Sequence, residues 1–220
     1  MNPFSELQFE ITHKCNKHCA GCNHRISTSP MPDMSIGDLD YVLSRLSAGD
    51  TDEIDTVELI GGEPLMHDHF CDLVYILDIY FSDHVRIKII TNGRLMPTVP
   101  KSVFDRCDWW VSKYPGWNDE IFQRYAGVRN VNLGSTKDWS DCEQNPCHSE
   151  EAAQAIKAKC PYKRVRIFGR WMYGCCMAEN NERAHGLYVG CEFTEKWRED
   201  WLSLPTEKAC SVCYLSSQYL

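Results

Sequence analysis

The sequence contains no run long and apolar enough to cross a membrane, and no export signal at its start. Its longest nearly uncharged run, Phe70–Phe81, contains Asp72 and Asp78 and is shorter than the roughly 20 apolar residues that span a bilayer. The first ten residues, MNPFSELQFE, lack the basic start and apolar centre of a secretory signal. These absences predict a cytoplasmic protein without a membrane partner.

Blocks of basic residues, internal repeats and low-complexity segments are also missing. The 23 Lys and Arg residues are outnumbered by 31 Asp and Glu, which gives a formal net charge of −8. Because non-specific binding to nucleic acid depends on clustered cations, this balance disfavours a nucleic-acid partner, although it permits a nucleotide-sized substrate. The 220 residues, 43% hydrophobic and 25% charged, are otherwise typical of a globular protein.

Cysteine is what the sequence has in excess. There are 13 cysteines, an odd number, in a chain longer than most disulfide-rich secreted domains. In a reducing compartment, such a density of thiols is better explained by metal ligands, with the remaining cysteines free. The spacing of the cysteines supports this interpretation.

Up to about residue 133, short β-branched runs alternate with amphipathic stretches. The predicted strands are Leu7–Thr12, Ile54–Ile60, Val85–Thr91, Trp109–Ser112 and Val128–Leu133. The predicted helices are Ser35–Leu46, capped by Ser35, then Asp68–Phe81, Ser102–Cys107 and Asn118–Tyr125, capped by Asn118. This alternation predicts an α/β protein with a parallel sheet, because parallel neighbours need crossover connections.

The polar motifs of the sequence follow these strands, and parallel sheets carry their chemistry at the carboxyl ends of their strands. The motifs are Cys15-x3-Cys19-x2-Cys22, Gly61-Gly62-Glu63-Pro64, Thr91-Asn92-Gly93 and Ser112-Lys113-Tyr114. Core packing gives no reason for this coincidence, so we expect all four at one edge of the sheet.

The first cysteine set places three thiols on one loop with no fourth cysteine close in sequence. A structural zinc ion needs a fourth protein ligand, which His13, His18 or His24 could supply. A four-iron cluster held by three thiolates instead keeps one iron open to an outside ligand. Both alternatives are compatible with the spacing alone.

The C-x3-C-x2-C after a first strand, followed by Gly-Gly-Glu-Pro after the second, resembles the radical S-adenosylmethionine (SAM) superfamily over residues 7–133. The resemblance implies a partial (β/α)6-type barrel with parallel strands, and a [4Fe–4S] cluster on Cys15, Cys19 and Cys22. In that family the amino and carboxylate groups of SAM chelate the open iron. An electron from the reduced cluster then cleaves the sulfonium and yields a 5′-deoxyadenosyl radical.

The resemblance also implies which residues contact SAM. Gly61 and Gly62 let the backbone approach the ligand without a Cβ, and Glu63 offers a carboxylate to its ammonium group. Asn92 and Ser112 are further candidates, the latter for the ribose. Family members often carry an aromatic residue just before the third cysteine, but this chain has Gly21 there.

From residue 140 onward the regular alternation fades, and a second cysteine set appears. We predict a core over residues 1–139 and a small cysteine-rich module over residues 140–220, with a helix at Ser149–Ala158 and a hairpin at Val165–Tyr173. The module resembles the twitch type, a shortened SPASM domain that binds an auxiliary [4Fe–4S] cluster. The implied ligands are Cys160, Cys175, Cys210 and Cys213, with Cys176, Cys191 and Cys147 as substitutes. A four-cysteine zinc site fits the same spacing.

The predicted function is a radical SAM enzyme that oxidises or rearranges a small polar metabolite. Its shortened module resembles that of the butirosin-pathway dehydrogenase type. Radical epimerisation or cross-linking of a ribosomally made peptide is the second hypothesis, and a non-catalytic, zinc-bound interaction protein is a third of another class. The first hypothesis implies a small-molecule substrate and an electron donor such as flavodoxin or ferredoxin.

Overall fold

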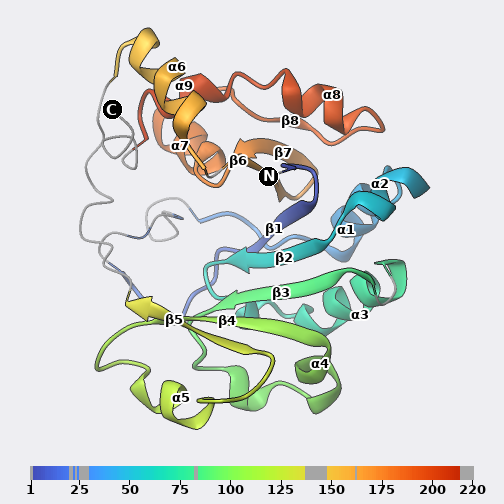
Figure 1. Ribbon diagram of the computed structural model, residues 1–220, viewed down its shortest axis with the longest axis vertical. Helices are drawn as coiled ribbons and strands as arrows, with labels where there is room; N and C mark the ends of the chain where they lie inside the picture. The colour runs from blue at the N-terminus through green and yellow to red at the C-terminus, as the bar shows by residue number, and fades with distance from the viewer. Residues whose placement is uncertain are drawn as a thin grey trace.

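The computed structural model describes residues 2–19, 22, 24, 30–81, 84–136, 148–161 and 163–213. Its centre is one eight-stranded sheet with the strand order β5-β4-β3-β2-β1-β6-β7-β8. The strands are β1 Glu6–Thr12, β2 Thr56–Gly61, β3 Arg86–Thr91, β4 Cys107–Lys113, β5 Val131–Thr136, β6 Lys163–Phe168, β7 Trp171–Cys175 and β8 Cys191–Glu192. Figure 1 shows the C-terminal elements beside β1, with β5 toward the other end of the sheet.

Six neighbouring strands, from β5 to β6, run parallel to one another, which confirms the predicted parallel α/β fold. The place of β6 differs from the sequence-based expectation of a separate hairpin. It does form a hairpin with β7, but it also pairs in parallel with β1, with Gln8 opposite Arg166. The predicted boundary after residue 139 lies outside the described residues, so the division into two domains stays a prediction.

Of the helices in the described residues, the first, third, fourth, fifth and sixth lie at about the predicted positions, and the other four were not predicted. The helices are α1 Ile36–Leu43, α2 Ala48–Glu53, α3 Phe70–Phe81, α4 Lys101–Arg106, α5 Asp119–Arg124, α6 Glu150–Lys159, α7 Ala178–His185, α8 Trp197–Leu202 and α9 Thr206–Cys210, with short 3-10 turns at Pro64–Met66 and Met96–Thr98. Ser35 caps α1 as predicted and forms a capping box with Asp38. Within the described ranges, no helix is long and apolar enough to cross a bilayer.

Asn118 occupies the predicted cap position of α5, but its side chain makes no capping bond. Its Nδ2 group instead donates to the carbonyl oxygens of Asn92 at 2.7 Å and Ser112 at 2.9 Å. These carbonyls follow β3 and lie near the end of β4. Asn118 therefore holds together two strand ends that carry predicted site residues.

The two faces of the sheet differ in chemistry. Alternate residues such as Leu7, Val57 and Ile87 are fully buried and form the main core with residues of α1 and α3. The residues between them point to the other face, where β1 to β3 carry Gln8, Glu58 and Lys88. The core thus lies under the helices, while the opposite face presents polar side chains.

Candidate active site

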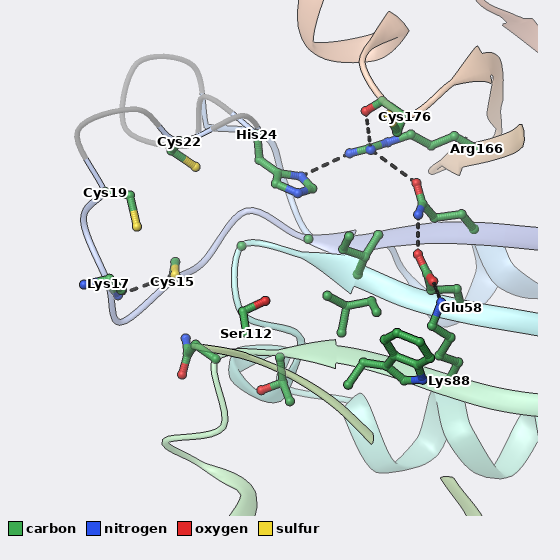
Figure 2. Close-up of a pocket in the computed structure, with 18 of the residues that line it drawn as sticks. Cys15, Lys17, Cys19, Cys22, His24, Glu58, Lys88, Ser112, Arg166 and Cys176 are labelled. Atoms are coloured by element: carbon green, nitrogen blue, oxygen red, sulfur yellow. Dashed lines mark hydrogen bonds and ion pairs between the residues drawn. The ribbon is translucent and has the colours of Figure 1, made fainter. Parts of the chain in front are cut away.

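A cavity of about 430 Å³ lies on the polar face of the sheet, near the carboxyl ends of its parallel strands. The three predicted ligands of the first cluster and four of the predicted SAM contacts line it, namely Cys15, Cys19, Cys22, Gly61, Gly62, Asn92 and Ser112. Figure 2 shows the cysteines on one side of this cavity and Ser112 across from them. The expected convergence of these motifs is therefore what the structure shows, although their binding roles stay predictions.

The three cysteines all present half-buried side chains. The backbone N–H of Lys17 donates to Cys15 Sγ at 3.4 Å, an orientation that suits a sulfur acting as acceptor. Burial raises the pKa of the Cys15 thiol to about 11, and it raises the pKa of Cys19 too. These thiols are neutral without a metal, so a bound cluster must displace their protons. Three thiols on one cavity wall fit the predicted iron–sulfur group.

Gly61 and Gly62 allow the end of β2 to pass close beneath the cysteine loop. A Cβ at Gly61 would lie 2.2 Å from the carbonyl oxygen of Thr12, and one at Gly62 would lie 2.3 Å from that of Lys14. Any side chain here would push the two segments apart. The backbone of Gly62 also donates to Thr12 O at 2.8 Å, so the two segments are locked in register.

Glu63 is fully buried and stands behind the residues that line the cavity. Its Oε1 accepts from the hydroxyl of Thr91 at 2.6 Å and its Oε2 from the backbone N–H of Asn92 at 2.8 Å. It also accepts from the N–H of Leu65 at 3.2 Å. Glu63 thus joins the ends of β2 and β3, and its predicted contact with the amino group of SAM stays a prediction.

Asn92 connects the end of β3 to the cysteine loop. Its Nδ2 donates to Asn16 Oδ1 at 2.8 Å, and Asn16 directly follows Cys15. The next residue, Gly93, has a φ of +82°, which favours glycine. This geometry fixes Asn92 between the loop and the sheet, so that its side chain lines the cavity.

A buried ionic network, which was not predicted from the sequence, contacts the loop that carries Cys15, Cys19 and Cys22. Glu10 of β1 accepts from Arg166 of β6, and its Oε1 lies 2.6 Å from Nδ1 of His24 and 3.2 Å from Nε2 of His13. Burial alone would raise the pKa of Glu10, but Arg166 and His24 hold it well below its usual range. Since His13 and His24 flank the cysteines in sequence, the network ties the cysteine loop to β1 and β6.

The same network contains the only group of three closely spaced metal-type ligands among the described residues, Glu10, His13 and Glu179. Two guanidinium groups already neutralise its carboxylates, because Arg166 binds Glu10 and Arg183 binds Glu179. The group is therefore explained by ion pairs within the protein.

The rest of the cavity wall was also missed, although the sequence carries a signal for it. The wall includes Gln8, Glu58, Lys88, Trp110, Arg164 and Arg166. In β1 to β3, polar residues alternate with apolar ones in runs such as LQFEI and RIKII. This period-two pattern predicts one apolar and one polar face, and it would have placed Gln8, Glu58 and Lys88 together on the polar face.

The second cysteine set gathers around α9. Cys160 follows α6, Cys175 ends β7, and Cys210 ends α9, while α9 packs against both α6 and β7. Burial raises the pKa of Cys175 well above its usual value, and nearby Cys176, Cys210 and Cys213 add to this. Cys160 acts in the same way on Cys210, whose pKa burial raises to about 11. The four predicted ligands therefore neighbour one another.

The substitute ligands lie in different places. Cys176 lines the main cavity, and its carbonyl oxygen accepts from Arg166. Cys191 lies in β8 and packs against the main core. Cys147 lies outside the described residues, as does Gly21. Cys160 lies close enough to Cys176 to raise its pKa, in addition to the effect of burial, so the choice of Cys175 over Cys176 stays a prediction.

Comparisons with known proteins bear on the fold and the site together. The chain is 35% identical over 98 residues to a probable GTP 3',8-cyclase of Methanothermobacter thermautotrophicus, which is 43% of this chain and 29% of that protein. It is 29% identical over 106 residues to an S-adenosylmethionine-dependent nucleotide dehydratase of Selenomonas ruminantium, which is 47% of this chain and 36% of that protein. The matches thus span about a third of each relative's length. No family model matches the chain.

Among solved structures, the fold is similar to that of BtrN in complex with AdoMet and 2-DOIA. The TM-score is 0.64 at 16% identity, over 94% of this chain and 85% of BtrN. These findings confirm the resemblance to the radical SAM superfamily and the predicted fold class. The chain has a sheet similar to that of BtrN and a cysteine-rich C-terminal region, and part of its sequence resembles proteins of the radical SAM superfamily.

Replacing Glu63 with glutamine should change how stability depends on pH. Burial raises the pKa of Glu63 to about 7 from an ordinary value of 4.5. The folded state therefore binds more protons than the unfolded state between these values, and stability falls as pH rises toward and through 7. The free energy of unfolding should lose about 3 kcal/mol between pH 5 and pH 8 in wild type relative to Glu63→Gln.

Urea unfolding of the two proteins at both pH values measures this difference. Glu120→Gln is a matched control, because Glu120 is an exposed carboxylate paired with Arg94. Equal pH dependence in wild type and Glu63→Gln would show that the buried carboxyl does not titrate in this range.

Proposed function

We propose that the chain reductively cleaves S-adenosylmethionine and uses the resulting radical to oxidise a small polar metabolite. The observation that carries the proposal is the convergence of three thiols with Gly61, Gly62, Asn92 and Ser112 on one cavity. The confirmed superfamily resemblance supports it, since the sequence matches include a protein named for its dependence on S-adenosylmethionine.

Cys15, Cys19 and Cys22 would hold the [4Fe–4S] cluster. When bound, such a cluster supplies an open iron for SAM and the electron that cleaves its sulfonium. The chain's own residues bind and orient the ligand: Gly61 and Gly62 bring the end of β2 against the segment that leads to Cys15, so that their backbone lines the cavity, and Ser112 offers a hydroxyl to the ribose of the ligand. The hydrogen bond from the backbone N–H of Asn92 to the Glu63 carboxylate holds the ends of β2 and β3 together.

Oxidation is the proposed outcome because a second cluster next to the cavity would accept an electron from the substrate radical. The predicted ligand Cys175 is adjacent in sequence to Cys176, which lines the cavity. BtrN, which shares the fold, was solved with AdoMet and the small molecule 2-DOIA. The two curated relatives favour a second candidate, a radical reaction on a nucleotide, since their names specify GTP and a nucleotide.

The test is to reconstitute the protein with iron and sulfide without oxygen, and then add SAM with reduced flavodoxin or dithionite. We expect 5′-deoxyadenosine and methionine to form, faster when a true substrate is present. A reduced, iron-loaded protein that forms no 5′-deoxyadenosine with any reductant would overturn the proposal. A flavodoxin- or ferredoxin-type donor is the proposed physiological partner.

Removing Cys210 and Cys213 should halve the iron content. We expect about eight iron atoms per chain in wild type, from two [4Fe–4S] clusters, and about four in the Cys210→Ala/Cys213→Ala variant. Bound metal also contributes folding free energy to a small module, so the variant should be less soluble. Iron and zinc analysis of both proteins measures this.

Cys191→Ala is the control, because Cys191 packs against the main core and should keep about eight iron atoms. About four iron atoms and one zinc in wild type would make the second site a zinc site. That result would remove the electron-acceptor role.

A further inference from the structure

The part of the cavity wall that is formed by the sheet, which we call the cavity floor, carries charged side chains. Opposite residues on neighbouring strands form a row across its polar face, with Arg166 beside Gln8, Gln8 beside Glu58, and Glu58 beside Lys88. Trp110 of β4 closes the row, since Lys88 Nζ lies 4.5 Å from the centre of its ring. Figure 2 shows Glu58, Lys88 and Arg166 of this floor at the side of the cavity away from Cys15, Cys19 and Cys22.

Cations outnumber carboxylates on the cavity wall, although the chain as a whole carries a formal charge of −8. The wall includes Lys17, Lys88, Arg164 and Arg166, and Glu58 is its one carboxylate among the described residues. Such a local reversal of sign raises the concentration of anions in the cavity.

Two of these cations are committed elsewhere. Arg166 is 1% exposed and donates to Glu10, Gln8 and the carbonyl of Cys176. Lys17 lies at the cysteine loop, 4.7 Å from the ring centre of Trp117. Neither is placed to bind a ligand on the floor.

Lys88 and Arg164 remain, and they share Glu58. Lys88 Nζ lies 2.6 Å from Glu58 Oε2, and Arg164 Nη1 lies 3.7 Å from its Oε1. Arg164 Nη1 also contacts Glu6, which is not part of the cavity wall, at 3.2 Å. Glu58 accepts from Gln8 as well, so one carboxylate contacts an amide and two cations.

Arg164 has an unused donor. Its Nε group is buried and has no hydrogen-bond partner among the described residues. That atom has no surface that a ligand could reach, but the side chain as a whole is 26% exposed and is part of the cavity wall. Among the described residues, its printed carboxylate contacts all use Nη1, so the guanidinium group keeps donors for an acceptor on a ligand. Guanidinium groups bind phosphate through two parallel bonds, and lysine adds a point charge.

We propose that the substrate carries a phosphate group, which binds Lys88 and Arg164 on the cavity floor. Trp110, 45% exposed, offers a flat face to the ring or sugar next to that phosphate. The inference rests on the proposed function and narrows its polar metabolite to a phosphorylated one. Nucleotides and sugar phosphates share this chemistry.

The competing possibility is that Glu58 binds an amino group of the substrate. Its Oε1 accepts from Gln8, its Oε2 lies 2.6 Å from Lys88 Nζ, and Arg164 Nη1 lies 3.7 Å away, so the carboxylate is already surrounded by donors and cations. Comparing the binding of phosphorylated and amine-bearing ligands distinguishes a phosphate site at Lys88 and Arg164 from an amino-group site at Glu58.

Calorimetry on cluster-loaded protein saturated with SAM tests the proposal. The probes are GTP against guanosine, glucose 6-phosphate against glucose, an aminocyclitol, and inorganic phosphate and pyrophosphate. We expect at least one phosphorylated probe to bind about tenfold or more tightly than its parent, and more weakly as salt increases. Comparing the affinities of GTP and glucose 6-phosphate shows whether the cavity prefers a nucleotide or a sugar phosphate.

Lys88→Met and Arg164→Gln should each weaken binding of that probe by about tenfold or more. Lys88→Arg keeps the charge and should stay within a few-fold of wild type. Lys113→Met is the matched control, because Lys113 is not part of the cavity wall and its Nζ lies against the ring of Phe122. Iron content and SAM binding of every variant show that the fold and first site are intact.

Three results would overturn the proposal: no binding of any phosphorylated probe to wild type at millimolar concentration, equal binding of each pair, or a preference for the aminocyclitol that Glu58→Gln removes. SAM cleavage is measured separately. A protein that forms 5′-deoxyadenosine but ignores phosphate would therefore keep the proposed function and lose this inference alone.

Discussion

Replacing Cys15, Cys19 and Cys22 together with alanine should abolish the formation of 5′-deoxyadenosine. The three thiols share one loop and one cavity wall, and they are the proposed ligands of the cluster that binds SAM. Without them no iron is held beside Gly61 and Gly62, so neither chelation of SAM nor electron transfer to it can occur. The expected loss is complete, whereas about half of the iron should remain at the second site.

The assay is the anaerobic reaction with SAM and reductant, followed by chromatography of the nucleoside products. Cys71→Ala serves as the control, because Cys71 is a half-buried thiol on α3 that packs against the main core. It should retain both iron and activity. Reductive cleavage of SAM by the triple variant would show that the reactive cluster lies elsewhere.

The second large effect concerns the stability of the whole sheet. Replacing Arg166 with methionine should lower the free energy of unfolding by about 3–5 kcal/mol, the range for breaking a buried ion pair. Glu10 is 0% exposed and Arg166 is 1% exposed, so the carboxylate left behind cannot reach water. Its contacts with His13 and His24 do not replace the guanidinium.

Urea denaturation of cluster-loaded protein measures this loss. Arg94→Met is a suitable comparison, because the Arg94–Glu120 pair is exposed on both sides and should contribute at most about 1 kcal/mol. The Glu10→Leu/Arg166→Met double variant should recover part of the stability, since it removes both buried charges. A single Arg166→Met variant as stable as Arg94→Met would contradict the assigned role of the network.

The sequence predicted the parallel sheet and its site edge because both depend on local patterns. The strand before Cys15 and the one before Gly61 are signalled by β-branched or alternating residues, and Ser35 marks a helix start by its own capping chemistry. The motifs after these strands then had to meet, since parallel strands share one carboxyl edge.

What the sequence did not predict depends on contacts between distant segments. The pairing of β6 with β1 brings Arg166 opposite Gln8 across more than 150 positions of chain, and no local pattern encodes this partner. The role of Asn118 was misread for the same reason, because its side chain binds carbonyls of two other segments in place of its own helix. The Glu10 network and the charged floor both depend on β6.

The position of β6 also sets the order in which the protein can be completed during synthesis. Strands β1 to β5 emerge first and can pair by crossovers between near neighbours, but the edge of β1 stays open until β6 is made. Until then Glu10 and Glu58 lack Arg166 and Arg164. Because contacts of high sequence separation form slowly, closing this edge is expected to be a late folding step. A nascent chain that acquired its first cluster before that step would carry it beside an unfinished cavity wall.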